Sequence, residues 1–345
     1  MELKEFMYEL PESLIAAYPA RDREASRLLV VRRESGQILH GGFSELENFL
    51  APGDLLVLND TKVFPARLRG VKESGGKAEV LLLERFPEKR SLWIALIEAA
   101  KKPSVGSRIK FSDNLVADVI GDLGRGRFGL EFHPGGEFTD HLEAVGEPPL
   151  PRYIRRNRET ASLDRERYQT IYAANPGAIA APTAGFHFTA ELLEKLAARG
   201  IERALLTLHV GPGTFQPVRS EQVENHRMEG ERYNLPAEAA EKIKRAKSNG
   251  RRVIAVGSTT TRALEWIALR KGSLQADEGI ARLFIRPGDP FRVVDALITN
   301  FHLPCSTPLM LVAAFAGLDL VRRAYREAVR LQYRFYSYGD AMLIL

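Results

Sequence analysis

Cysteine is almost absent from this chain of 345 residues, which holds a single one, Cys305. One cysteine excludes an intrachain disulfide framework and any zinc or iron–sulfur site that needs several cysteines. Because such a composition is typical of a reducing compartment, we expect the protein in the cytoplasm. Cys305 has no basic neighbour in the sequence to activate its thiol, so we expect a small buried side chain rather than a nucleophile.

Long apolar runs are also scarce. The stretch 296–318 carries no charged residue and is long enough to span a bilayer. Asn300, His302 and Pro308 interrupt it, which favours a polar loop followed by a short buried helix from about Leu309. The N-terminal segment has scattered acidic residues and no continuous apolar run, so we expect neither a signal peptide nor a transit peptide.

Neither sign of charge is in marked excess, because Lys and Arg total 49 and Asp and Glu total 44. This balance permits a nucleic-acid partner without indicating one. Hydrophobic residues make up 45% and charged residues 27%, which is typical of a folded globular protein and excludes a disordered chain. At roughly 150 residues per domain, the length predicts about two domains.

Four apolar segments each run directly into a polar or glycine-containing loop, a pattern typical of α/β proteins. These predicted strands are 55–58, 204–210, 253–256 and 293–298. Ligands of open α/β sheets bind beyond the carboxyl ends of the strands, so we expect the four loops to form the site. Thr189 is the predicted N-cap of a helix that Gly200 ends, and a second helix runs from Pro236 to Gly250.

The stretch between these α/β segments has short alternating apolar runs separated by glycine, proline and charged turns, which predicts a small all-β domain. Between residues 67 and 149 it carries 13 basic and 13 acidic residues, so it is not a basic nucleic-acid arm. We therefore predict two domains: a discontinuous α/β domain, 1–66 and 151–345, and an inserted β-domain, 67–150.

The sequence GSTTTR, residues 257–262, is the best-defined candidate anion site. Helix N-terminal N–H groups, three hydroxyls and Arg262 would converge there on a phosphate or carboxylate. The alternative is that the hydroxyls only cap the helix. His187, His209 and His302 lie near the candidate loops, and each is either a general base or a hydrogen-bonded core histidine. No histidine spacing predicts a zinc site.

A basic segment follows the predicted β-domain and interleaves arginine with tyrosine. Its arginines and first tyrosine are Arg152, Tyr153, Arg155, Arg156, Arg158, Arg165 and Arg167. Arginine for phosphate and tyrosine for a base plane is how single-stranded or loop RNA is held, although a solvated loop with local ion pairs is the alternative. A second basic stretch, 242–252, adds some weight to RNA binding.

Seven strings spread over residues 18–344 carry a resemblance to a known family. They are YPARDREASRLLVV, PGDLLVLNDTKVFPARLRG, RERYQTIYA, GAIAAPTAGFHFT, TLHVGPGTFQPV, ITNFHLPCSTPLMLVAAFAG and YRFYSYGDAMLI. In these strings the chain resembles the S-adenosylmethionine:tRNA ribosyltransferase-isomerases of queuosine biosynthesis. Phe186, Glu229 and Pro308 depart from the family pattern. The resemblance implies an α/β domain with an inserted six-stranded β-barrel.

The resemblance also implies a reaction in which S-adenosylmethionine is consumed as a substrate, with no metal or redox cofactor. Its ribosyl part passes to the 7-aminomethyl-7-deazaguanine at the tRNA wobble position, which gives epoxyqueuosine and releases adenine and methionine. A base must remove a proton beside the sulfonium, and the modified base must reach a pocket.

We expect His187, His209 and Asp60 nearest the ribose, with one of the two histidines as the base and His187 first. The expected substrate-binding residues are Asn59, Thr61, Thr183, Gly185, Gly211, Gly213, Thr214, Ser258, Thr259, Arg262, Asn300, His302 and Asp340. The expected tRNA-binding residues are Arg152, Tyr153, Arg155, Arg156 and Arg158. A non-catalytic tRNA-binding module and a hydrolase remain the alternatives, and a monomer is expected because no heptad pattern or exposed apolar stripe demands a dimer.

Overall fold

The computed structural model describes residues 1–345 except 87, 90, 152, 155–160, 216–217 and 219. It divides the chain into two compact units. The first comprises Met1–Lys62, Tyr153–Arg155 and Arg167–Leu345, and the second comprises Val63–Arg152 and Arg156–Glu166. The larger unit is thus discontinuous in sequence. The domain limits 1–66, 67–150 and 151–345 stay a prediction.

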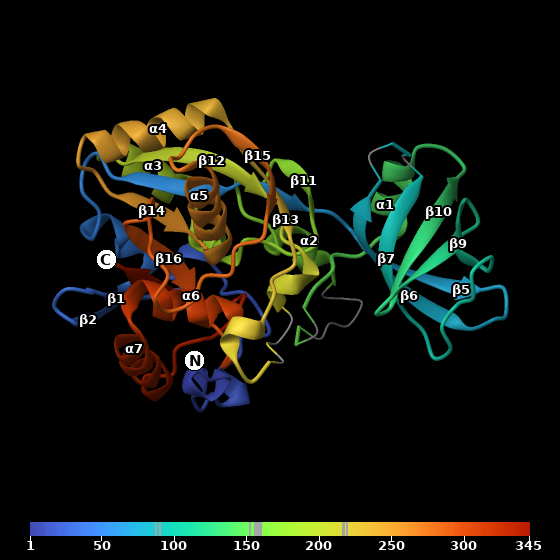
Figure 1. Cartoon of the computed structure of the whole chain (residues 1–345), viewed down its shortest axis with the longest axis horizontal. Helices are drawn as coiled ribbons and strands as arrows, with labels where there is room; N and C mark the ends of the chain where they lie inside the picture. The colour runs from blue at the N-terminus through green and yellow to red at the C-terminus, as the bar shows by residue number, and fades with distance from the viewer. Residues whose placement is uncertain (87, 90, 152, 155–160, 216–217, 219) are drawn as a thin grey trace. The chain divides into compact units, whose positions relative to one another are not determined.

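The larger unit is built on a nine-stranded mixed sheet in the order β15-β13-β12-β3-β14-β16-β17-β1-β2 (Figure 1). Its strands are β1 (Arg27–Val31), β2 (Ile38–Gly42), β3 (Leu55–Asn59), β12 (Glu202–Leu208), β13 (Glu231–Leu235), β14 (Val253–Val256), β15 (Asp277–Ala281), β16 (Ala296–Asn300) and β17 (Ala341–Ile344). Strands β12, β3, β14 and β16 are neighbours and run parallel. These four overlap the four predicted strands, so their polar exits lie along one edge of the sheet.

Two predicted strands are shifted along the chain: β12 covers Glu202–Leu208 rather than 204–210, and β16 covers Ala296–Asn300 rather than 293–298. The backbone N–H groups of Val293 and Val294 donate to the Glu265 carboxylate at 3.0 and 2.9 Å. A buried side chain therefore takes the bonds that a strand partner would have taken.

Both faces of the sheet are covered by apolar side chains, which makes three layers. Leu55 and Val57 pack in one core with helices α4 (Ala237–Ser248), α5 (Ser258–Lys271), α6 (Thr307–Ala316) and α7 (Leu318–Arg330). Leu56 and Leu58 pack in the other core with α3 (Ala190–Ala198) and the 3-10 helix η4 (Phe43–Asn48). Alternate residues of β3 point to opposite faces, as strand geometry requires.

The helix ends follow local sequence signals. Thr189 is the N-cap of α3, because its side chain accepts a hydrogen bond of 3.1 Å from Leu192 N. Gly200, with φ +77°, follows α3 as predicted. Helix α6 begins two residues before the predicted start, because the Ser306 hydroxyl accepts from Leu309 N. Within the described ranges, no helix is long and apolar enough to cross a membrane.

The smaller unit contains a closed antiparallel barrel of six strands in the order β10-β7-β6-β5-β8-β9, which confirms the expected barrel. Its strands are β5 (Arg67–Lys72), β6 (Lys77–Arg85), β7 (Leu92–Glu98), β8 (Arg108–Ser112), β9 (Leu115–Gly124) and β10 (Arg127–Pro134). The α-helices and strands that remain among the described residues of the whole chain are α1 (Phe138–Val145), α2 (Ala161–Arg167) and the two-stranded sheet of β4 (Thr61–Val63) and β11 (Asn175–Ala178).

Candidate functional site

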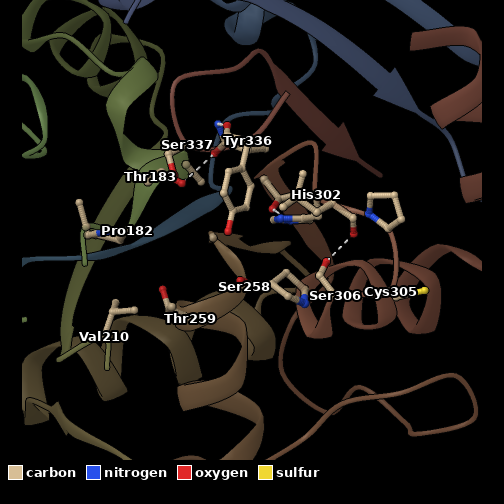
Figure 2. A pocket seen from close by; sticks show the side chains of 18 residues that line it. Pro182, Thr183, Val210, Ser258, Thr259, His302, Cys305, Ser306, Tyr336 and Ser337 are labelled. Carbon is tan, nitrogen blue, oxygen red and sulfur yellow. Dashed lines mark hydrogen bonds between the residues drawn. The ribbon is translucent and has the colours of Figure 1, made fainter. Parts of the chain in front are cut away.

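A pocket of about 300 Å³ lies at the carboxyl ends of the parallel strands (Figure 2). Val210 follows β12, Ser258 and Thr259 follow β14, and Asn300 ends β16. The wall is completed by Ala181, Pro182, Thr183, Ala184, Gly257, Thr299, His302, Leu303, Pro304, Cys305, Ser306, Pro308, Tyr336 and Ser337. Three of the four predicted strand exits therefore contribute to one cavity, at the low end of the volume range of ligand pockets.

The start of α5 forms one side of this pocket. Gly257 has φ +96°, a conformation that favours glycine, and it donates its N–H to Ile298 O at 2.8 Å. Ser258 and Thr259 then open the helix and line the cavity. The first N–H groups of a helix have no acceptor within the helix and carry partial positive charge, so this wall suits an anionic group.

The rest of the GSTTTR sequence turns away from the cavity, and this corrects the predicted convergence. The hydroxyls of Thr260 and Thr261 donate to backbone carbonyls, Val256 O at 2.7 Å and Gly257 O at 3.1 Å. Arg262, which the structure describes, is not one of the residues that line the pocket. A helix turns about 100° per residue, so only part of the sequence can face one cavity.

Arg262 forms a buried ion pair instead. Its Nη1 lies 2.6 Å from Glu231 Oε2, and both side chains are at most 6% exposed. Its Nε donates to Leu283 O at 3.0 Å, while Glu231 Oε1 accepts from Gly211 N at 3.0 Å. Arg262 therefore links α5 to β13 and, through Glu231, to the loop after β12.

Asn300 is a wall residue whose amide is engaged by the protein. Its Nδ2 donates to Tyr336 O at 3.2 Å and lies 3.3 Å from His187 Nε2, and its Oδ1 accepts from the Thr183 hydroxyl. The His187 Nδ1 lies 2.7 Å from Ser26 Oγ, so both ring nitrogens have partners. Burial, with the positive charges of Arg23 and Arg334, lowers the pKa of His187 to about 3. His187 lies behind Asn300 and is not on the wall.

His302 is the histidine that the structure places on the pocket wall. Its Nε2 lies 2.8 Å from Thr299 Oγ1, and its backbone N–H donates to the Tyr325 hydroxyl at 3.1 Å. The Tyr8 hydroxyl donates to His302 O. Burial lowers the pKa of His302 to about 3, so its imidazole is neutral near pH 7.

Five polar residues at the ends of β3 and β12 bond mainly to one another and to the backbone, and we call them the β3–β12 cluster: Asn59, Asp60, Thr61, Thr207 and His209. Asn59 Nδ2 donates to Leu208 O at 3.0 Å, and its Oδ1 accepts from Leu208 N at 3.0 Å and Thr61 N at 3.1 Å. The Thr207 hydroxyl donates to Asp60 Oδ1 at 2.6 Å. Thr61 Oγ1 lies 2.8 Å from His209 Nδ1. None of the five lines the 300 Å³ pocket.

His209 faces a separate groove that also includes Arg232 and Asn234. Burial lowers the pKa of His209, while the nearby Asp60 carboxylate acts in the opposite direction and Arg232 adds to the lowering. The three predicted catalytic residues are thus divided. Asp60 and His209 lie in one cluster, and His187 lies behind Asn300.

Of the other predicted substrate-binding residues, Gly185 and Asp340 have structural contacts away from the pocket wall. A Cβ on Gly185 would lie 2.1 Å from the Tyr172 hydroxyl, so this glycine is required by packing. Gly213 and Thr214 lie in the 3-10 helix η6 (Pro212–Phe215). The Asp340 carboxylate accepts from Arg27 N at 3.0 Å and from Arg334 N at 2.7 Å, which ties β1 to the segment before β17.

Tyr336 and Ser337 are among the wall residues that the sequence did not predict. Tyr336 has φ +74°, which no local sequence signal indicates. The Tyr153 ring packs on it with centroids 4.5 Å apart, and the Tyr153 hydroxyl accepts from Ser337 N at 3.2 Å. Tyr153, predicted to contact tRNA, thus packs beside the pocket wall. Arg152, Arg155, Arg156 and Arg158 lie outside the described residues.

The second basic stretch is largely neutralised by nearby acidic side chains. On α4, Lys242 pairs with Glu238 at 2.7 Å and Lys244 with Glu241 at 2.9 Å. The other pairs are Arg245–Glu202, Lys247–Asp295 and Arg252–Asp54. Local ion pairing therefore accounts for most of this stretch, and it does not add to the case for RNA binding.

Comparison with known proteins assigns the whole chain. A family described as "Queuosine biosynthesis protein" matches residues 3–344. The chain is 52% identical over 344 residues to the S-adenosylmethionine:tRNA ribosyltransferase-isomerase of Pelobacter propionicus, and 51% identical over 347 residues to that of Symbiobacterium thermophilum, with 100% of each chain covered.

A solved structure agrees with this result. The S-adenosylmethionine tRNA ribosyltransferase of Thermotoga maritima is 39% identical, with a TM-score of 0.56 over 99% of this chain and 100% of that one. Sequence similarity along the full length and the shared architecture lead to the same conclusion: the chain belongs to the S-adenosylmethionine:tRNA ribosyltransferase-isomerase family of queuosine biosynthesis.

Proposed function

We propose that this enzyme transfers and isomerises the ribosyl moiety of S-adenosylmethionine onto 7-aminomethyl-7-deazaguanine at the wobble position of tRNA. The products are epoxyqueuosine in tRNA, adenine and methionine. The observation that carries the proposal is the end-to-end match to relatives named for this activity. Because those relatives are enzymes, catalysis is favoured over a non-catalytic tRNA-binding module. The proposal includes a monomer that acts in the cytoplasm without a metal or redox cofactor.

S-adenosylmethionine is proposed to bind in the 300 Å³ pocket. The start of α5 offers N–H groups to the methionine carboxylate beside Ser258 and Thr259. A tRNA phosphate is the alternative anion for this helix end. Pro182, Val210 and Tyr336 supply apolar and aromatic surface for the rest of the ligand.

The proton beside the sulfonium is proposed to pass to a histidine that is neutral near pH 7. His302 fits this role by position, because it is on the pocket wall. Burial keeps its imidazole neutral but also makes it a weaker base, so the proposal depends on its place in the pocket. His187 and His209, predicted from the sequence, are the alternatives. In that case Asp60 would either hold the ribose or orient His209, because its carboxylate charge raises the pKa of His209.

The tRNA is proposed to be held by the guanidinium groups of Arg152, Arg155, Arg156 and Arg158. Clustered arginines bind phosphates through a salt-dependent term that does not depend on sequence. Replacing all four with alanine should weaken tRNA binding and flatten its dependence on salt. Unchanged affinity together with an unchanged salt slope would remove this segment from the interface.

The experiment that tests the function is an assay of adenine release from S-adenosylmethionine. We expect release to depend on tRNA that carries 7-aminomethyl-7-deazaguanine, with one methionine formed per adenine. Formation of S-adenosylhomocysteine would instead indicate methyl transfer. Tight tRNA binding without any turnover would favour the binding module.

A further inference from the structure

Tyr336 is a pocket-wall aromatic for which the sequence assigned no role. Figure 2 shows its ring among the labelled wall residues, with Pro182 and Thr183 on one side of it in this view and His302 on the other. The remaining labelled wall side chains are proline, valine, serine, threonine or cysteine. Among the described wall residues, Tyr336 is therefore the one with a six-membered aromatic ring.

The backbone of Tyr336 is held in an unusual conformation by several contacts. Its φ of +74° is uncommon for a bulky residue. Its N–H donates to Phe301 O at 3.0 Å, and its carbonyl accepts from Gly339 N at 2.9 Å and from Asn300 Nδ2 at 3.2 Å. Strained residues that the surrounding structure supports in this way cluster at ligand sites.

Two neighbours complete the support of the ring. A Cβ on Gly339 would lie 2.5 Å from Arg334 O, so only glycine permits this tight turn after Tyr336. The Tyr153 ring packs against the Tyr336 ring at 4.5 Å and 54°, and its hydroxyl accepts from Ser337 N. The Tyr336 ring is thus presented to the cavity by a turn, an amide and a second aromatic ring.

We propose that Tyr336 is the platform on which a purine-like base of the substrate stacks in this pocket. The inference rests on the proposed function and deepens it. Aromatic side chains stack on bases through their π-faces with little dependence on base identity. Both substrates of the proposed reaction carry such a ring, adenine in S-adenosylmethionine and 7-deazaguanine in tRNA. The position of Tyr336 across the pocket from the start of α5 favours adenine.

The test measures ligand binding as well as turnover, using the full-length chain. We expect Tyr336→Ala to weaken binding of S-adenosylmethionine without tRNA by on the order of 10- to 100-fold. Tyr336→Phe keeps the π-face and should stay within about twofold, and Tyr336→Leu should lie between the two. Tyr18→Ala, which removes a tyrosine that is 51% exposed, is the matched control.

Competition separates stacking from a merely structural role. In Tyr336→Ala, adenosine should compete less well against S-adenosylmethionine, while methionine should compete as in the wild type. Equal losses for adenosine and methionine would overturn the proposal, because they would indicate a collapsed pocket. Tyr336→Leu binding as tightly as Tyr336→Phe would also overturn it.

The two possible bases are distinguished by the kinetics. Unchanged affinity for S-adenosylmethionine with a raised KM for tRNA in Tyr336→Ala would assign the platform to 7-deazaguanine. No change for either substrate would overturn the proposal. A wild-type chain that binds S-adenosylmethionine through Tyr336 but releases no adenine would contradict the proposed function alone.

Discussion

Two polar regions lie at the same edge of the sheet, and they differ in what their side chains contact. At the exit of β16, Thr299, Asn300 and His302 line a cavity, although each also has a partner in the protein. At the exits of β3 and β12, the β3–β12 cluster bonds mainly to itself and to the backbone, and none of its five residues lines that cavity.

The difference shows that a polar strand exit has two physical uses. Strand ends leave backbone groups that must be paired when they are buried, and a buried asparagine can pair several of them. Asn59 does this for Leu208 and Thr61. Only where the following chain turns away, as after Asn300, do the side chains border open space. We therefore expect substitutions at β16 to affect chemistry and substitutions at Asn59 to affect stability.

The largest expected effect concerns the histidines of the two regions. His302→Gln should lower single-turnover adenine release by about 10²–10⁴-fold, the usual loss for a general base, whereas His209→Gln should lower it much less. His187→Gln should act through Asn300 and fall between them. The assay uses saturating tRNA. Loss in His209→Gln with normal release in His302→Gln would reverse the comparison and restore the β3–β12 cluster as the catalytic region.

The buried pair of Arg262 and Glu231 tests the same contrast between structural and pocket-facing side chains within α5. Ser258 and Thr259 face the cavity, and Arg262 does not. Glu231→Leu leaves a buried guanidinium without its counter-charge, which should lower the free energy of unfolding by about 3–5 kcal/mol. Adding Arg262→Met should recover much of that loss. Urea unfolding measures the free energy of unfolding of the single and the double variant. If Arg262→Ala raised the KM for S-adenosylmethionine and left stability unchanged, Arg262 would belong to the site.

Asn59 tests whether the β3–β12 cluster supports stability rather than substrate binding. Asn59→Leu removes the partners of Leu208 N, Leu208 O and Thr61 N, so the free energy of unfolding should fall by about 2–4 kcal/mol. The KM for S-adenosylmethionine should change little. Asn114→Ala, at an exposed turn of the barrel, is the control and should alter neither quantity. A stable Asn59→Leu protein with poor substrate binding would contradict a structural role.

The effect that is smallest near neutral pH is a dependence of stability on pH, which grows as the pH falls. The pKa of both His187 and His302 is about 3 in the folded protein and near 6.5 when unfolded, so the unfolded chain binds more protons between these pH values. Stability should be full above about pH 6.5 and fall towards pH 3, by about 1.4 kcal/mol per pH unit for each histidine. Unfolding measured at several pH values should show a shallower slope in His302→Gln. The Asn114→Ala control, which removes no titratable group, should keep the wild-type slope.

Local sequence patterns predicted the four strands of the α/β sheet, the inserted all-β region and the cap at Thr189, because each depends on residues close together in the chain. The six-stranded barrel was expected from the family resemblance. They did not predict the partner of Arg262, since Glu231 lies 31 positions away and meets it only through the fold. Nor did they predict Tyr336 on the pocket wall, because its positive φ depends on contacts with Phe301 and Asn300. Residue types indicated chemistry, and tertiary contacts decided which residues border the cavity.

The most direct measurement is a crystal structure of the full-length enzyme with S-adenosylmethionine bound. We expect the ligand in the 300 Å³ pocket, with its carboxylate at the N–H groups of Ser258 and Thr259 and its adenine against Tyr336. Ligand bound instead in the groove of His209, Arg232 and Asn234 would contradict this placement, because the β3–β12 cluster would then border the substrate.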